Sequence, residues 1–201
     1  PEQKVFSAAI EIENPKKVIP SSYSIPKEND IVVVNYFEAS YLEGVIFTSA
    51  AVFHKSVFEK VGHFDPKIKS GQDTDLWIRI GLIYPVVFSF KILSRYIYDA
   101  HSLSKKKMTM NDKMDFSKFI EAEKKNLDLK KFLDLNRYSL AIKSKLYGDK
   151  INYIKFKKDI NLHNLTLKKR ILLFLPGSVL QFLLRINLLL VQLGLSKTVF
   201  K

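Results

Sequence analysis

The sequence predicts an α/β fold, with a mixed α/β half over residues 1–104 and a basic, mostly helical region over residues 105–201. In the first half, short runs rich in Val, Ile, Phe and Tyr alternate with helical patterns and with loops that contain Pro and Gly. In the second half, strand-like runs are replaced by apolar residues at helical spacing. At 201 residues the chain can bury a core in one or two domains.

The composition indicates a folded protein with a strongly basic second half. Hydrophobic residues make up 47% and aromatic residues 12% of the chain, which argues against disorder. Cysteine is absent, so disulfides and thiolate metal sites are excluded, and a reduced cytoplasm fits. Residues 1–100 carry 11 Lys/Arg and 12 Asp/Glu, whereas residues 101–201 carry 22 and 8. We therefore expect the second half to favour an anionic partner: a membrane surface, a nucleic acid or an acidic glycan.

The elements of the first half follow from local residue patterns. Residues 4–13 read as a strand, and residues 14–30, with three prolines, read as a loop. Residues 31–43 fit either a strand or a short helix, and residues 45–62 begin strand-like and end as a helix stopped by Gly62. Residues 73–84 predict a helix that ends before Pro85, and residues 85–99 predict two short β segments.

The second half contains two helical patterns. The first places Leu133, Arg137, Ala141 and Ser144 on neighbouring turns and stops at Gly148. The second, over residues 160–201, contains no acid and six Lys/Arg, and polar residues interrupt its Leu-rich run too often for a membrane span. Its polar residues form a narrow stripe opposite a wide apolar face, which either packs on residues 115–160 or lies in the plane of a membrane with Lys168–Arg170 near anionic headgroups.

Residues 69–80, KSGQDTDLWIRI, place two acids at the start of a predicted helix. One reading is structural, with Asp73 or Thr74 capping free backbone N–H groups and Asp75 serving as a helix-start cap or a structural partner. The other reading is a catalytic carboxylate at the mouth of a cleft. The preceding loop, VGHFDPKIKSG, has two glycines and a proline, which favours a shaped backbone that lines a site.

The stretch TSAAVFHKSVFEKVGHFDPKIKSGQDTDLWIRIGLIYPVVFSFKILSRYIYDAHSLS resembles the second half of a family-2 glycosyltransferase catalytic module with the GT-A fold. That family has a Ser-Ser-containing strand, a Val-Gly-Gly-Phe-Asp loop, and a Glu-Asp pair that opens a helix of Leu-Trp-Arg type. The resemblance covers residues 1 to about 104. It implies an inverting enzyme that transfers a sugar from a nucleotide-sugar to a hydroxyl of a surface glycan, including one carried on a lipid, with Mg²⁺ or Mn²⁺ neutralising the departing diphosphate.

The resemblance places Asp73 at the position of the general base, which removes the proton of the acceptor hydroxyl. Gln72 stands where the family has its preceding acid. Gly62 matches the first loop glycine, and His63 replaces the second. Thr48 and Ser49 match the Ser-Ser pair near the acceptor cleft, or are plain strand-end hydroxyls.

Three further residues are candidates by the same resemblance. Trp77 and Arg79 follow on the predicted helix as acceptor-binding candidates, with a core position as the alternative for Trp77. His101 matches a late histidine that reaches the metal or the diphosphate, or it is an exposed loop residue. The metal-binding Asp-X-Asp motif of the family is missing, because QDTD occupies the base position.

We therefore expect a fragment that lacks the N-terminal nucleotide-binding half and does not transfer sugar alone, in an enzyme on the cytoplasmic face of the inner membrane. A different class stays open: a non-catalytic basic module that binds nucleic acid or an acidic glycan. Lys155–Lys158, with Tyr153 and Phe156 interleaved, favour it through charge and stacking. The lack of a recognised nucleic-acid motif disfavours a nucleic-acid partner.

Overall fold

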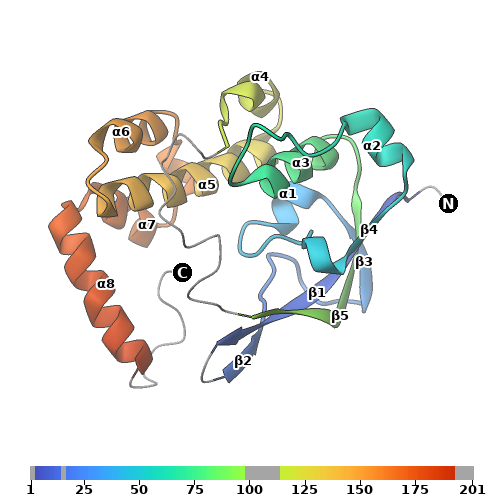
Figure 1. The fold of residues 1–201 in the computed structure, drawn as a ribbon, viewed down its shortest axis with the longest axis horizontal. Helices are drawn as coiled ribbons and strands as arrows, with labels where there is room; N and C mark the ends of the chain where they lie inside the picture. The colour runs from blue at the N-terminus through green and yellow to red at the C-terminus, as the bar shows by residue number, and fades with distance from the viewer. Residues whose placement is uncertain (1–2, 15–16, 98–113, 193–201) are drawn as a thin grey trace. The chain divides into compact units, whose positions relative to one another are not determined.

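The computed structural model describes residues 3–14, 17–97 and 114–192 (Figure 1). It confirms the predicted fold class, because a mixed sheet with short helices is followed by a mostly helical region. The chain divides into two compact units, residues 1–132 and 133–201, which we describe separately. The predicted boundary after residue 104 falls among residues 98–113, outside the described part of the chain.

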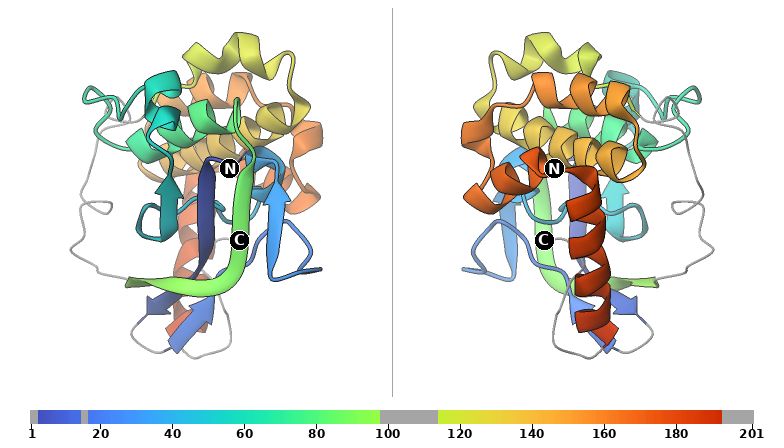
Figure 2. Two further views of the ribbon diagram at one scale, coloured as in Figure 1. Left: turned by 90° about the vertical axis from the view of Figure 1, so that its right-hand side faces the viewer. Right: turned by 90° about the vertical axis from the view of Figure 1, so that its left-hand side faces the viewer.

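The first unit is built on a five-stranded mixed sheet. Its strands are β1 (Val5–Asn14), β2 (Lys17–Pro20), β3 (Ile31–Val34), β4 (Ala51–Phe53) and β5 (Val86–Ile97). The parallel pair β1 and β5 lies at the centre, with Phe6 opposite Val87. β2 and β4 pair antiparallel with β1, and β3 pairs antiparallel with β5. In the left panel of Figure 2 most helices of the unit are drawn above these strands.

Short helices complete the first unit. They are α1 (Tyr36–Ala39), η1 (Thr48–Ala50), α2 (Ser56–Val61), α3 (Gln72–Gly81), η4 (Ser117–Phe119) and α4 (Ile120–Glu123). The side chains between sheet and helices are almost fully buried and apolar, including Val5, Phe37, Leu76, Ile78 and Phe88. Burial of this apolar surface is the main term that stabilises the unit.

Local side-chain and glycine signals set the helix ends. The Asn35 side chain accepts a hydrogen bond from the Phe37 N–H at 2.8 Å and so begins α1, which means that residues 31–43 form a strand and then a helix. Gly62 ends α2 with a φ of 79°, as the sequence predicted, and Gly71 precedes α3 with a φ of 88°. Glycine adopts this left-handed backbone without the penalty of a Cβ atom.

Two predictions for the first unit need correction. Residues 14–30 are not entirely loop, because β2 pairs with β1 and places Ile19 opposite Ile12; Pro20 is tolerated at the end of an edge strand. Residues 86–97 form one strand rather than two, although the register of β5 against β1 shifts between Ser89 and Ile92. This irregularity interrupts the apolar alternation and explains why the sequence suggested two segments.

The second unit is helical. Its elements are α5 (Leu127–Leu146), which enters the unit at Leu133, then α6 (Lys150–Lys158), η5 (Leu162–Asn164), α7 (Leu167–Phe174) and α8 (Gly177–Gln192). The predicted spacing in α5 is confirmed, because Leu133, Arg137, Ala141 and Ser144 are all buried. Gly148 follows the helix with a φ of 75°.

Polar contacts inside the second unit fix the helix junctions. Asp134 is buried with Arg137 at 3.3 Å and accepts hydrogen bonds from the Asn161 N–H at 3.1 Å and from Asn164 Nδ2 at 2.7 Å. Lys145 Nζ donates to the carbonyls of Leu173, at 2.6 Å, and Leu175, at 2.8 Å, at the end of α7. No helix in the described ranges is long and apolar enough to span a bilayer.

Candidate functional site

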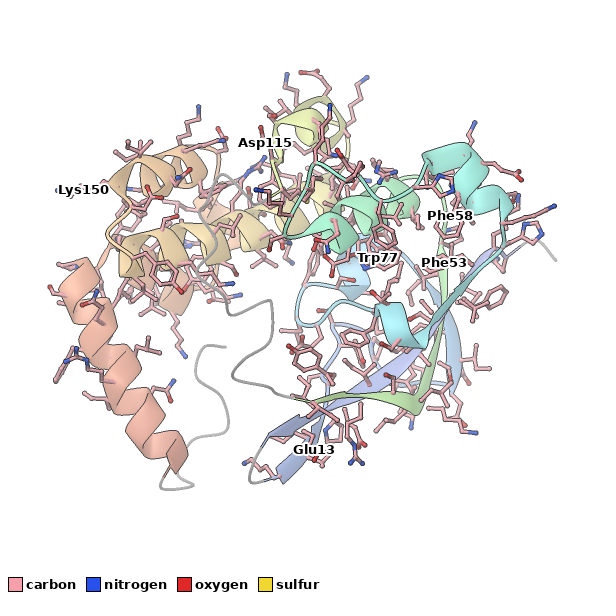
Figure 3. The ribbon with its side chains drawn as sticks, in the orientation of Figure 1. Glu13, Phe53, Phe58, Trp77, Asp115 and Lys150 are labelled. Carbon is pink, nitrogen blue, oxygen red and sulfur yellow. The ribbon has the colours of Figure 1, made fainter. Side chains whose placement is uncertain are left out.

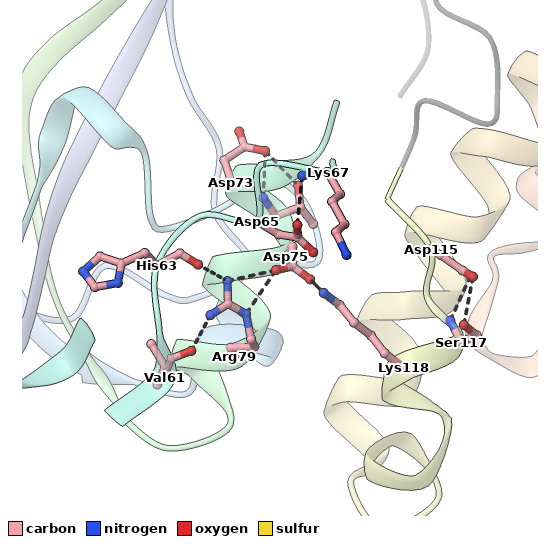
Figure 4. A network of polar contacts seen from close by, with 11 residues as sticks. Val61, His63, Asp65, Lys67, Asp73, Asp75, Arg79, Asp115, Ser117 and Lys118 are labelled. Atoms are coloured by element: carbon pink, nitrogen blue, oxygen red, sulfur yellow. Dashed lines mark hydrogen bonds and ion pairs between the residues drawn. The ribbon is translucent and has the colours of Figure 1, made fainter. Parts of the chain in front are cut away.

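The candidate site is the turn that begins α3 (Figure 4). The loop before it is ordered by its own backbone contacts, since Asp65 Oδ1 accepts from the Lys67 N–H at 2.9 Å. The main chain turns at Gly71, and an added Cβ there would lie 3.3 Å from Met114 Cβ. Ser70 also accepts a hydrogen bond from the Met114 N–H at 3.0 Å. The start of α3 is thus held from two sides.

Asp73 projects into solvent from the first turn of α3. Its Oδ1 accepts hydrogen bonds from the backbone N–H of Thr74 at 2.7 Å and from Thr74 Oγ1 at 3.4 Å. Its Oδ2 accepts no hydrogen bond from the residues that the structure describes. Asp73 therefore keeps one carboxylate oxygen that is open to a bound molecule.

Asp75 has the opposite environment. Its carboxylate is fully buried, at 0% exposure, and both oxygens face cations. Oδ2 accepts from Arg79 Nε at 3.0 Å and Arg79 Nη2 at 2.9 Å, and Oδ1 pairs with Lys118 Nζ. Asp75 is therefore a structural partner, and no oxygen of this carboxylate is open to an acceptor.

Arg79 connects α3 to the preceding loop. While Nε and Nη2 hold Asp75, Nη1 donates to the carbonyl of Val61, and Nη2 also donates to the carbonyl of His63 at 2.7 Å. Gly62 lies between these carbonyls, and an added Cβ there would lie 3.5 Å from Arg79 Nη1. The guanidinium of Arg79, predicted to contact substrate, is occupied by the loop and by Asp75.

Lys118 comes from the segment after residue 113 and was not singled out from the sequence. Asp115 begins its short helix by accepting hydrogen bonds from the Ser117 N–H at 3.0 Å and from Ser117 Oγ at 2.9 Å. Lys118 then reaches the buried Asp75. Since 43 positions separate the two residues in the chain, no local pattern could have paired them.

Trp77 belongs to the core. Its side chain is 5% exposed; it stacks on Phe53 with ring centroids 5.2 Å apart and meets the edge of Phe64 at 6.1 Å (Figure 3). The core position that the sequence left open is the one that the structure shows. Its role is to anchor α3 against β4.

The other predicted site residues lie on the surface. Thr48 and Ser49 are exposed in η1, and Gln72 is exposed beside Asp73. His63 is exposed and stacks on Phe58 at 5.7 Å. No hydrogen bond joins Thr48 or Ser49 to Asp73 within the described residues.

The predicted metal ligand His101 lies outside the described residues. In the ranges that are described, no group of three His, Asp or Glu side chains is arranged to hold a metal ion. The carboxylates nearest the candidate site do not fit this role, because Asp75 is neutralised by Arg79 and Lys118. These residues therefore supply no site for Mg²⁺ or Mn²⁺.

Tyr36 is a neighbour of Asp73 that sequence reasoning missed. Burial raises the pKa of the Tyr36 phenol, and the negative charge of Asp73 raises it further, whereas a hydrogen bond with Ser40 lowers it. The ring packs against Gly81, where an added Cβ would lie 2.7 Å from Tyr36 Cδ1. A glycine at the end of an apolar helix was the one signal of such a close approach.

No protein-family model, curated protein or solved structure matches this chain. The resemblance to family-2 glycosyltransferases therefore stays a prediction from the residues quoted above. Any function of the α3 turn is therefore argued from its side chains and their contacts.

Proposed function

We propose that this chain is the acceptor-side part of an inverting family-2 glycosyltransferase module with the GT-A fold. The module transfers a sugar from a nucleotide-sugar to a hydroxyl of a surface glycan, including a lipid-linked one, and Asp73 is its general base. One observation carries the proposal: Asp73 holds an open carboxylate oxygen at the start of α3, on a turn that buried contacts of Asp75 and Arg79 brace.

The chemistry needs a fixed carboxylate that reaches the acceptor hydroxyl. In the proposed step the hydroxyl proton passes to Asp73 Oδ2 while the hydroxyl oxygen bonds to the anomeric carbon of the donor. The bond from that carbon to the nucleoside diphosphate breaks on the opposite face. A rigid turn holds the carboxylate in one orientation. Bringing the reacting groups into the correct orientation is a large part of the activation barrier of such a transfer.

The partners follow from the same proposal. The donor is a nucleotide-sugar bound by another half of the module, and a divalent metal, Mg²⁺ or Mn²⁺, would be held there rather than by this chain. We assign no step to the metal, because the described residues of this chain form no site for it. We further propose that the protein works on the cytoplasmic face of the inner membrane; a lipid-linked acceptor and the basic second unit support this location.

The test is sugar transfer by a polypeptide that joins this chain to its nucleotide-binding half. We expect Asp73→Asn to lower kcat by about 10²–10⁴-fold with unchanged donor affinity, because an amide cannot take up the proton. Glu59→Gln, an exposed acid-to-amide change on α2, is the matched control and should keep full turnover. Turnover by Asp73→Asn equal to that of the control would remove Asp73 from the reaction.

The binding-module alternative depends on aromatic side chains in α6 that are free to stack. Phe156 is buried, and the Tyr153 hydroxyl donates to the Leu173 carbonyl at 3.0 Å. Lys145 lies over the Tyr153 ring at 4.2 Å. These rings are engaged within the unit, so only the charge of α6 supports a nucleic-acid partner, and we favour the transferase.

A further inference from the structure

Helix α8 has an exposed apolar face that its own unit does not cover. Leu180 is 1% exposed and packs into the unit, whereas Phe182, two residues later and so on the opposite side of the helix, is 62% exposed. The residues beside Phe182 that are also exposed, each at 38%, are Val179, Leu183 and Ile186. Their spacing of i, i+3, i+4 and i+7 puts them on one side of the helix, over roughly 100° of its surface. We call these four residues the α8 apolar face.

The rest of the α8 surface consists of a polar stripe and a side that packs on the unit. Ser178, Gln181 and Arg185 form a polar stripe on the flank of the α8 apolar face, and Gln181 Nε2 donates to the Leu146 carbonyl at 3.0 Å. Leu180 is buried, and Leu184, one turn further on, is half-buried. The helix therefore packs on protein around Leu180 and Gln181 and still leaves the α8 apolar face exposed.

The unit that carries this face is strongly cationic. Residues 133–201 contain 13 Lys/Arg and 3 Asp/Glu, and no acid occurs after Asp159. Arg185 is exposed on α8 itself, and Lys168 is exposed at the start of α7. The preceding helix carries a further exposed apolar row, Leu167, Ile171 and Phe174, and Lys157 Nζ lies 4.2 Å from the centre of the Phe174 ring.

We propose that the α8 apolar face inserts into the interface of an anionic lipid bilayer, with α8 lying in the membrane plane. An exposed apolar stripe beside Arg185, on a unit with a large excess of Lys and Arg, matches anionic headgroups above acyl chains, and it matches neither bulk water nor a neutral partner. The absence of a spanning helix in the described residues fits a helix that lies on the surface. This inference deepens the membrane placement in the proposed function by naming the surface that makes the contact.

The test is co-sedimentation of the full chain with vesicles. We expect binding to vesicles of phosphatidylcholine mixed with an equal amount of phosphatidylglycerol, and little binding to phosphatidylcholine alone. Added salt should weaken the binding, because it screens the attraction to the headgroups. Phe182→Asp should lower the partition coefficient about tenfold or more, because a charge replaces an inserted ring.

A matched control separates insertion from the change in net charge. Leu127 is 83% exposed on α5 in the first unit, so Leu127→Asp makes an equal change in charge away from the α8 apolar face and should bind like the wild type. Arg185→Gln should reduce binding to anionic vesicles more than Lys60→Gln on α2, which is also exposed. Thermal unfolding checks that each variant is folded.

Three outcomes would overturn the inference. One is equal recovery in the supernatant with and without anionic vesicles. Another is equal loss of binding in Phe182→Asp and Leu127→Asp. The third is an oligomer that Phe182→Asp dissociates while vesicle binding is unchanged, since the face would then join copies of the chain. Asp73→Asn should bind vesicles normally, so failure of the proposed chemistry and failure of this inference are distinguishable.

Discussion

Asp73 and Asp75 lie two residues apart and have opposite environments. Positions two apart in an α-helix point about 200° from one another, so one acid of the pair faces the core when the other faces solvent. The apolar residues that follow could not say which, because Leu76, Trp77, Ile78 and Ile80 surround much of the helix. Asp75 is the buried acid because Arg79 and Lys118 neutralise its carboxylate. Of these two cations only Arg79 is near Asp75 in sequence.

Gly81 is the residue at which a missing side chain matters most. A Cβ there would lie 2.7 Å, 2.8 Å and 3.0 Å from Tyr36 Cδ1, Cβ and Cγ. We expect Gly81→Ala to lower the free energy of unfolding by about 1–2 kcal/mol, because overpacking a buried ring exceeds the gain of up to ~1 kcal/mol in helix propensity. Urea unfolding measures this change.

Gly44→Ala is the control for this prediction. A Cβ at Gly44 meets only the Ile46 carbonyl, at 3.8 Å, so the free energy of unfolding should change by less than about 0.5 kcal/mol. Equal stability of Gly81→Ala and Gly44→Ala would contradict the direct packing of the Tyr36 ring against Gly81.

At the scale of elements, α3 is held by the ion pairs of Asp75. Asp75→Asn leaves the charges of Arg79 and Lys118 without their carboxylate, and Arg79 then holds the Val61 and His63 carbonyls less well. We expect the free energy of unfolding to fall by about 2–3 kcal/mol, because the buried carboxylate of this three-residue cluster is removed. The loss is limited because Arg79 and Lys118 are partly exposed. Urea unfolding is again the measurement.

Asp73→Asn provides the comparison within the same turn. Asp73 is exposed and an amide oxygen can still accept from the Thr74 N–H, so the free energy of unfolding should change by less than about 0.5 kcal/mol. Equal losses in the two variants would show that the buried pair does not hold α3.

The strands show what element patterns can and cannot predict. β1 and α3 were predicted with ends close to the observed ones, because each has one dominant period. β2 was missed because its stability comes from pairing with β1 and not from its own four residues, which include a proline. The phase shift in β5 likewise depends on its partner strand.

At the scale of the whole molecule, the amino-acid pattern predicted a mixed sheet followed by a helical region. It could do so because strand-like and helical periods occupy different halves of the chain. It did not predict the partners of Asp75 or the neighbourhood of Tyr36. Those contacts join segments far apart in sequence, and only tertiary packing brings them together.

Buried tyrosines in both units give the molecule a common response to alkali. Burial raises the pKa of Tyr23, Tyr36 and Tyr41 in the first unit and of Tyr138 in the second. Above about pH 10 the unfolded chain releases these phenol protons while the folded chain keeps them. The unfolded state then binds fewer protons, so stability must fall as the pH rises.

Tyr36→Phe isolates one of these groups. We expect the free energy of unfolding to fall between about pH 8 and about pH 11, and to fall by about 1 kcal/mol less in Tyr36→Phe, which has no phenol proton to lose there. Urea unfolding at both pH values, compared between the wild type and the variant, cancels the effect of lysine titration. Parallel losses in the two proteins would mean that Tyr36 is not held protonated by burial.

The pairing of β1 with β5 has a consequence for how the first unit is made. These two strands form the centre of the sheet, yet Phe6 and Val87 lie about 80 residues apart in the chain. During synthesis β2 and β4 can pair with β1 long before β5 is made, so the centre of the sheet forms late, and the edge of β1 that pairs with β5 is unprotected until then. We expect the unpaired edge of β1 to limit the rate of folding and to promote aggregation during synthesis.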